Sequence, residues 1–320
     1  MADAYPEVTQ AAPERAWPAL AQWAAALVGT WLVLASFTAL VDPYAFTGAP
    51  RVPGWTERKY EMAEFGRVAK LREVARLKPT AIVLGNSQAE GGLRTATLER
   101  LTGLGAYNLG FLGARIEETA VAFEHALRVA PVRTAVLALD YVAFEPAEER
   151  AVLLRARAER RIGREARDLA DLTFSMQGFL AAVRGVTLNR MGGVPTHDGR
   201  GNWSARQPVA IDDAAVPVAT VPPADGAYAA FEAICRAAAE RGVDLRLVVM
   251  PVHKAFGLDM EMRARWVARL AAIAQSHGFT LHDEGGDLAF NADKSHFIDR
   301  GHVSVAIGDV ILDRLFGAAR

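Results

Sequence analysis

The sequence is poor in cysteine and carries almost no net charge. Cys235 is the only cysteine in 320 residues, so an intramolecular disulfide and a cysteine-rich metal site are both excluded. The formal net charge is −1, which gives no electrostatic reason to expect nucleic acid as a partner. Because Cys235 lies in a helical pattern, we interpret it as a buried structural thiol.

Signatures of metal and nucleotide binding are also missing. The segment 85–92 lacks both the G-x-G-x-x-G pattern and the Lys-Ser/Thr pair of a phosphate-binding loop. The histidines are not spaced as zinc ligands are; those considered are His253, His282, His296 and His302. The sequence therefore predicts neither a metal nor a cofactor.

One long stretch lacks charge altogether. From Trp17 to Val41 no residue is charged, and 25 residues are enough to cross a hydrocarbon core of about 30 Å as a helix. Trp17, Trp23 and Tyr44 lie near its ends, where aromatic rings prefer the membrane interface. A cleaved signal peptide is the alternative, but the run is too long and has no clear small-residue cleavage site. We predict one uncleaved transmembrane helix.

The rest of the chain divides around this span. We predict a tail over 1–16, the anchor over 17–41, a linker and amphipathic helix over 42–78, and a domain over 79–320. Few basic residues flank the span, and more follow it than precede it. A strict positive-inside count would leave the domain in the cytoplasm.

The predicted domain alternates between two patterns. Apolar strand-like runs occur at 81–84, 134–139 and 245–250, with shorter candidates at 105–109 and 280–282. Helical patterns fill the gaps, at 96–101, 117–130, 227–241, 259–278 and 303–316. Apolar strands separated by amphipathic helices predict an α/β fold with a mostly parallel sheet that helices cover on both faces.

An insertion at about 145–221 interrupts the alternation. Its first part, 147–170, carries arginines and glutamates at helical spacing, which favours a solvated surface helix. Its second part, 191–221, is rich in glycine and proline and includes His197 and Trp203. A lid over the sheet edge and an ordinary surface excursion both fit this second part.

Two short segments contain the parts of a serine hydrolase. Ser87 follows the first strand and its terminal Gly85, at the edge where α/β folds place their chemistry. Asp293 and His296 are three residues apart, so one turn can carry both a base and the carboxylate that orients it. Taken alone, Ser87 also fits a helix N-cap.

Two other histidines allow alternatives. His253 follows an apolar strand at the same edge, so both a substrate contact and a loop histidine with a local hydrogen bond remain open. His302 precedes the last helical pattern, where capping or plain exposure is the better interpretation.

Several of these segments, in this order, resemble the sequence blocks of the SGNH (GDSL-like) hydrolase superfamily. The matching segments are Leu84-Gly85-Asn86-Ser87, Asn108 to Gly113, the strand end at Asp140, and Asp293-x-x-His296. With the N-terminal anchor, the layout is similar to that of membrane-anchored bacterial SGNH-like proteins. Among these, it resembles the D-alanyl transfer protein of teichoic acid modification and, more distantly, the alginate O-acetylation proteins. The resemblance implies a three-layer SGNH/flavodoxin-like fold.

The resemblance also implies roles for individual residues. Ser87 would be the nucleophile, His296 the general base and Asp293 its orienting carboxylate. The oxyanion would be stabilised by the Ser87 N–H and by Gly113, with Gly110 as the alternate glycine.

The third sequence block departs from the family pattern. Asp140 stands where the superfamily has an asparagine, and a carboxylate would repel an oxyanion. Either Asp140 holds a loop by accepting N–H groups, or Asn86 or Asn108 completes the oxyanion hole.

The function implied by the resemblance is an esterase or O-acyltransferase. It would act on acyl esters, acetyl esters first among them, of a cell-envelope glycan. The protein would cross the inner (cytoplasmic) membrane once, with its domain in the periplasm, and this outweighs the charge count. The alternative is a weakly active or inactive SGNH-fold protein that binds glycan or serves as a scaffold for a membrane-bound acyltransferase.

Overall fold

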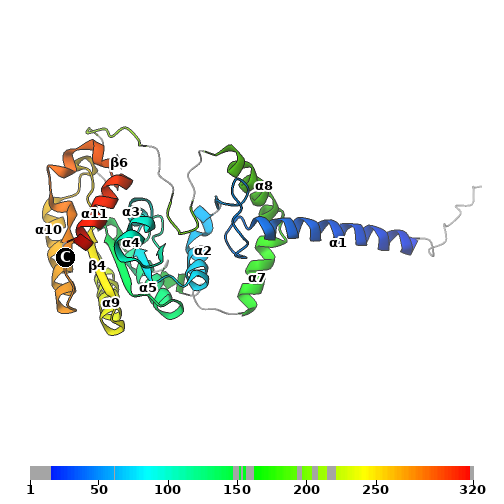
Figure 1. Cartoon of the computed structure of the whole chain (residues 1–320), viewed down its shortest axis with the longest axis horizontal. Helices are drawn as coiled ribbons and strands as arrows, with labels where there is room; N and C mark the ends of the chain where they lie inside the picture. The colour runs from blue at the N-terminus through cyan, green and yellow to red at the C-terminus, as the bar shows by residue number, and fades with distance from the viewer. Residues whose placement is uncertain are drawn as a thin grey trace, which may run out of the picture.

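The computed structural model describes residues 16–60, 62–146, 151–152, 154–155, 162–192, 197–203, 208–214 and 221–317. A single helix, α1 (Ala16–Val41), projects from a body that contains all the described strands (Figure 1). Within the described residues, α1 is the one helix long and apolar enough to cross a membrane. The predicted arrangement of an apolar N-terminal helix followed by an α/β body is confirmed.

A five-stranded parallel sheet, in the order β2-β1-β3-β4-β5, forms the centre of the body. The strands are β1 (Ala81–Leu84), β2 (Ala106–Asn108), β3 (Thr134–Leu139), β4 (Asp244–Val249) and β5 (Leu281–Asp283). Every residue of β1 and β3 is buried, as expected for strands covered on both faces. Successive side chains enter opposite cores: Ile82 belongs to one apolar cluster and Val83 to the other.

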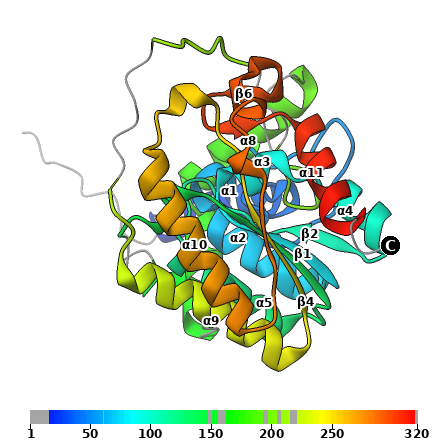
Figure 2. The same cartoon turned by 90° about the vertical axis from the view of Figure 1, so that its left-hand side faces the viewer.

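Helices cover both faces of the sheet and complete three layers. One face carries α2 (Met62–Leu77), α5 (Ile116–Val129), α9 (Asp225–Arg241) and α10 (Met260–Ser276). The other carries α3 (Ser87–Gly92), α4 (Thr95–Thr102) and α11 (Val305–Gly317). Figure 2 shows α9 and α10 on one side of the strands and α4 and α11 on the other. Cys235 is buried in α9, and burial raises the pKa of its thiol to about 12, which fits a structural role.

The remaining described elements lie in loops and at the base of α1. Helices α7 (Ile162–Thr173) and α8 (Met176–Met191) pack beside the C-terminal part of α1 (Figure 1). Five 3₁₀ turns occur among the described residues: η2 (Tyr141–Phe144), η3 (Lys254–Phe256), η4 (Glu284–Gly286), η5 (Phe290–Ala292) and η6 (Lys294–His296). A two-stranded antiparallel hairpin, β6 (Phe297–Asp299) and β7 (His302–Val303), precedes α11.

Residues 42–60, which include the stretch 42–54 expected as a linker, are fixed to the body. The Asp42 carboxylate accepts hydrogen bonds from the backbone N–H groups of Phe46, Thr47 and Gly48. The buried Lys59 ammonium donates to the carbonyl of Val41, the last residue of α1, at 2.7 Å. The orientation of α1 relative to the body is therefore held by specific contacts.

Gly85 makes the sharp exit from β1 that presents the next residues at the sheet edge. Its φ is +138°, and a Cβ there would lie 2.6 Å from the carbonyl oxygen of Ala138. We expect Gly85→Ala to lower the free energy of unfolding by about 1–3 kcal/mol. Gly105→Ala is the matched control, because Gly105 has no positive φ and a Cβ there meets nothing. Urea unfolding of the full chain in detergent measures both; equal losses would contradict the expectation.

Candidate active site

Ser87 lies directly after Gly85 and Asn86 at the carboxyl end of strand β1 and begins α3. The preceding residue, Asn86, caps this helix: its Oδ1 accepts the backbone N–H of Gln88 at 3.0 Å. Ser87 is half-buried at the edge of the sheet, where α/β folds bind ligands. Its hydroxyl thus lies at the strand end, as expected from the sequence.

The imidazole beside Ser87 is that of His302. His302 Nε2 lies 2.8 Å from Ser87 Oγ, and His302 Nδ1 lies 2.8 Å from Asp299 Oδ1. An ionised carboxylate only accepts hydrogen bonds, so Nδ1 carries the proton and donates to Asp299. Nε2 is then free to accept the Ser87 hydroxyl proton. Serine, histidine and aspartate form one continuous hydrogen-bonded chain.

The β6–β7 hairpin explains the geometry of this pair. Asp299 and His302 are directly opposite each other in the antiparallel register, with only Arg300 and Gly301 between them. Directly opposed residues on a hairpin have adjacent side chains, so the pair needs no long-range contact to meet. The Asp299 carboxylate also accepts the Gly301 backbone N–H at 2.8 Å, which fixes its orientation.

The sequence assignment of Asp293 and His296 is corrected by this geometry. His296 stacks on Phe290 and its Nδ1 lies 3.1 Å from the Phe290 carbonyl, not beside Ser87. The exposed Asp293 accepts hydrogen bonds from both the backbone and the hydroxyl of Ser295, which lower its pKa. His296 Nε2 is 3.6 Å from Asp293 Oδ2, but among the described contacts the imidazole bonded to Ser87 Oγ is that of His302.

The same Asp-x-x-His spacing therefore occurs twice within ten residues, in two backbone conformations. Asp293 to His296 is a 3₁₀ turn, whereas Asp299 to His302 is a two-residue hairpin. Spacing does not distinguish them. A sequence signal existed, since apolar Phe297-Ile298 and Val303 flank Arg300-Gly301 as strands flank a turn. The expectation that His302 caps a helix or is simply exposed is also wrong, because its ring lies between Ser87 and Asp299.

His253 supports the hairpin from beneath. Its side chain is fully buried, and its Nδ1 accepts the Ala255 backbone N–H at 3.1 Å, which matches the local-hydrogen-bond alternative. Its backbone N–H donates to the Arg300 carbonyl at the hairpin turn, and its ring packs on Phe297. Because the ring is buried beneath the hairpin, the substrate-contact alternative is not favoured.

Asp140 acts as an acceptor that holds the residues on either side of Ser87, at the turn from β1 into α3. Its carboxylate accepts Asn86 Nδ2 at 2.9 Å, Gln88 Nε2 at 3.1 Å and the Val142 backbone N–H at 2.7 Å. This is the loop-holding role weighed from the sequence. The Asn86 amide is committed to Asp140, so it is not aimed at an oxyanion beside Ser87.

The remaining groups expected to stabilise the oxyanion are Asn108, Gly110 and Gly113, and the structure places them in different surroundings. Asn108 is fully buried; its Nδ2 donates to the carbonyls of Ala89 and Leu93, and its Oδ1 accepts the Gly110 N–H. Asn108 and Gly110 are therefore engaged in structural bonds. Gly113 lies in an exposed turn with φ +63°. Asn86, like Asn108 and Gly110, is thus engaged in structural bonds, whereas the Ser87 N–H belongs to the nucleophile itself.

A cleft of about 210 Å³ opens beside Ser87 and His302. Its walls are mostly apolar and come from segments far apart in the sequence. They include Leu112, Trp203, Pro208, Ile298, Val303 and Val305. The size and apolar lining suit a small acyl group next to the serine.

The second part of the insertion forms one wall of this cleft. The Trp203 backbone N–H donates to the Glu90 carbonyl at 3.0 Å, and the Arg200 carbonyl accepts the Asn108 N–H at 2.8 Å. The Trp203 ring packs edge-on against His197. Residues 197–203 thus cover the edge of the sheet beside the site, which favours the lid alternative over a plain surface excursion.

A buried charge cluster lies behind the same wall. Lys70 Nζ is 2.8 Å from Glu90 Oε1, and His197 Nε2 is 2.7 Å from the same oxygen. Burial opposes ionisation of Glu90, but the charge of Lys70 and the hydrogen bonds from His197 and Lys70 outweigh it and hold its pKa at about 2. Burial lowers the pKa values of Lys70 and His197. Glu90 also lines the cleft, so the cluster places charged groups directly behind the cleft wall.

This cluster predicts acid sensitivity. The pKa of Glu90 rises from about 2 when folded to its ordinary value of 4.5 when unfolded, so the unfolded chain binds the proton more readily. The stabilisation is complete above pH 4.5 and is lost as the pH falls toward 2. We expect urea midpoints to decrease over this window, and less so in Glu90→Gln. An identical slope in both proteins would contradict the assignment.

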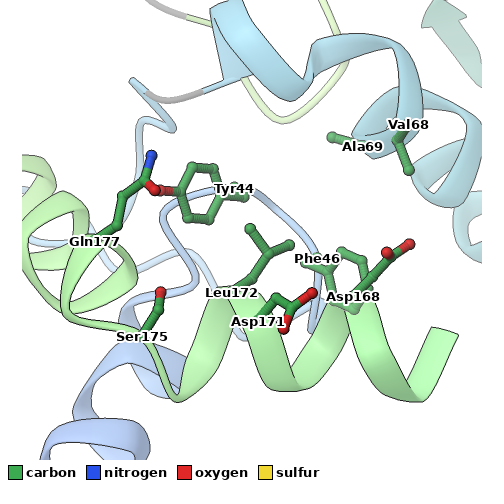
Figure 3. Close-up of a pocket in the computed structure, with 9 residues that line it drawn as sticks. All are labelled: Tyr44, Phe46, Val68, Ala69, Asp168, Asp171, Leu172, Ser175 and Gln177. Atoms are coloured by element: carbon green, nitrogen blue, oxygen red, sulfur yellow. The ribbon is translucent and has the colours of Figure 1, made fainter. Parts of the chain in front are cut away.

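A second cavity, of about 240 Å³, lies near the base of α1. It is bounded by Tyr44 and Phe46 and by side chains from α2, α7 and α8 (Figure 3). None of the nine residues drawn there is a histidine, and Ser175 Oγ accepts the Gly178 N–H as a helix cap. Within the described residues, no group of three or more His, Cys, Asp or Glu side chains is arranged to hold a metal. The cleft beside Ser87 is therefore the candidate active site.

No protein-family model matches the chain, and no curated protein matches it in sequence. Among solved structures, the fold is similar to "The structure of a putative platelet activating factor from Streptococcus pneumonia". The TM-score is 0.45 at 14% identity, over 81% of this chain and 93% of that one.

Proposed function

We propose that the protein is a membrane-anchored serine esterase or O-acyltransferase with Ser87 as nucleophile, His302 as general base and Asp299 as its orienting carboxylate. The observation that carries the proposal is the continuous hydrogen-bonded chain from Ser87 Oγ through His302 to Asp299, open to an apolar cleft. The SGNH-like order of the sequence blocks supports the same chemistry, with Asp299-x-x-His302 in the place that the resemblance gave to Asp293-x-x-His296.

The steps follow from the geometry. Ser87 Oγ attacks the ester carbonyl carbon while its proton passes to His302 Nε2. The bond to the leaving alkoxide breaks, the alkoxide takes the proton from His302, and the acyl group remains on Ser87. Water or a glycan hydroxyl then attacks the acyl-enzyme, with His302 again as base. Asp299 keeps the imidazole in the reactive tautomer and stabilises its protonated form.

The apolar cleft has room for a short acyl group such as acetyl, and the Trp203 side chain forms part of its wall. We expect Trp203→Ala to raise the ratio of kcat/KM for butyryl over acetyl p-nitrophenyl esters by at least about tenfold, because one added methylene in an apolar pocket is worth roughly 10- to 200-fold and butyryl has two more than acetyl. Pro208→Ala, a smaller change in the same wall, is the control. If Trp203→Ala left the ratio unchanged, the acyl group would not bind against Trp203, and this part of the proposal would be wrong.

Anchoring through α1 supports transfer on a cell-envelope glycan outside the inner membrane. A tether holds the site near membrane-linked acyl donors and raises their effective concentration for the second step. Simple hydrolysis uses the same intermediate with water as acceptor.

The test is covalent labelling followed by product analysis. The purified full chain in detergent is treated with a serine-directed fluorophosphonate, alongside Ser87→Ala, and acetate release from an O-acetylated oligosaccharide is measured. We expect labelling and acetate release in the wild type only. If the wild type remains unlabelled under conditions where a known esterase reacts, the enzyme proposal fails.

A non-catalytic glycan-binding or scaffold protein is the second candidate. It is favoured by the engagement of the Asn86 and Asn108 amides in structural bonds, since loss of one oxyanion donor costs about 10²- to 10³-fold in rate. Calorimetric titration with acetylated and deacetylated oligosaccharides separates the two. A binder shows affinity without acetate release.

A further inference from the structure

Helices α7 and α8 lie where the free part of α1 ends. All side chains from Trp17 to Val33 are exposed, and Ala35 is the first residue of α1 buried against the body. Phe37 then packs edge-on against Phe179 of α8, with ring centroids 5.9 Å apart. Figure 1 shows α7 and α8 running across α1, at the side of the body from which α1 projects.

The free part of α1 is too short to cross a membrane by itself. Roughly 17 residues at about 1.5 Å per residue give about 25 Å, against a hydrocarbon core of about 30 Å. If α1 spans the bilayer, the core extends to the residues of α1 that α8 covers. Because the Lys59 contact with Val41 and the Asp42 turn fix α1 to the body, sliding the body away would break specific bonds.

Part of the exposed surface of α8 is apolar, as a surface beside the membrane end of α1 is expected to be. Met176, Leu180 and Val183 follow one another at helical spacing and are 51%, 58% and 40% exposed. Phe174, in the turn before α8, is 52% exposed. The helix contains no acidic residue, and its charged side chains are Arg184 and Arg190. Apolar residues beside arginines are typical of helices that lie in the headgroup and acyl-chain boundary.

We propose that the surface formed by Phe174, Met176, Leu180 and Val183 is a second membrane contact, embedded in the lipid boundary alongside α1. The occupant is the bilayer itself. This contact goes beyond the proposed acyl chemistry and rests only on α1 crossing the membrane. Because α1 is already fixed to the body, this second contact sets the tilt and rotation of the whole molecule in the bilayer, so that the cleft keeps one orientation toward the membrane plane.

The experiment places a single environment-sensitive NBD label on the full chain in lipid-only nanodiscs. Cys235→Ala removes the native thiol, and labels are attached at Leu180→Cys and Val183→Cys. Val28→Cys, in the free part of α1, reports on the span, and the exposed Glu240→Cys on α9 reports on water. We expect blue-shifted emission and several-fold stronger quenching by nitroxide lipids at 180 and 183 than at 240.

The outcomes separate the contact from its premise. Water-like signals at 180 and 183 with a lipid signal at 28 would overturn the proposal while leaving the anchor intact. A water-like signal at 28 would remove the span and the proposal together, without bearing on Ser87. Since the nanodiscs contain no other protein, a surface that a partner protein covers would also give the first result.

Discussion

Replacement of His302 by alanine is expected to lower kcat by about 10⁴- to 10⁶-fold, because the Ser87 hydroxyl then has no base within hydrogen-bond distance. His296→Ala, in the neighbouring Asp-x-x-His segment, is expected to change kcat by no more than a few-fold. Hydrolysis of p-nitrophenyl acetate and the rate of fluorophosphonate labelling measure both. Each variant loses one histidine, and the two positions are only six residues apart, so the two variants are closely matched.

The carboxylate of Asp299, which orients His302, can be tested in the same way. Asp299→Asn is expected to lower kcat by about 10⁴-fold, because an amide favours the wrong imidazole tautomer. Asp293→Asn is expected to leave kcat near the wild-type value. Thermal melts establish that each variant is folded. If His296→Ala abolished activity while His302→Ala retained it, the site drawn from the hydrogen bonds would be overturned.

The largest expected effect on stability comes from the buried pair behind the cleft. Lys70→Met is expected to lower the free energy of unfolding by about 3–5 kcal/mol, because it leaves the Glu90 carboxylate buried without its cation. Lys70 also donates to the Gly110 carbonyl at 2.6 Å, and that acceptor loses its donor too. Urea unfolding in detergent, followed by tryptophan fluorescence, gives the value.

Two further proteins test the cause. Lys70→Met/Glu90→Leu removes both charges and is expected to recover most of the loss, since a buried pair is often replaceable by apolar side chains. Arg265→Ala breaks an exposed pair whose side chains are 65% and 81% exposed, and should cost no more than about 1 kcal/mol. A loss in Lys70→Met as small as that in Arg265→Ala would mean that water reaches the cluster.

The sequence alone was sufficient wherever the signal was local. Runs such as 81–84 and 135–139 are apolar at every position, as expected for strands covered on both faces, so the layers of the fold followed from the pattern. The uncharged stretch before Asp42 predicted the projecting helix in the same way. Gly85 and Ser87 were locatable because a nucleophile at a strand end needs a sharp backbone exit.

Tertiary structure decided which groups meet. Two Asp-x-x-His segments have equal spacing, and only the hairpin that His253 supports carries its imidazole across to Ser87. Asp140 likewise changed from an obstacle to an acceptor once Asn86, Gln88 and Val142 were placed around it. A sequence pattern shows which positions of a helix or strand are buried, because burial repeats with the period of that element. It does not record which hydrogen-bond partner arrives from 215 positions away, since that depends on how separate elements pack.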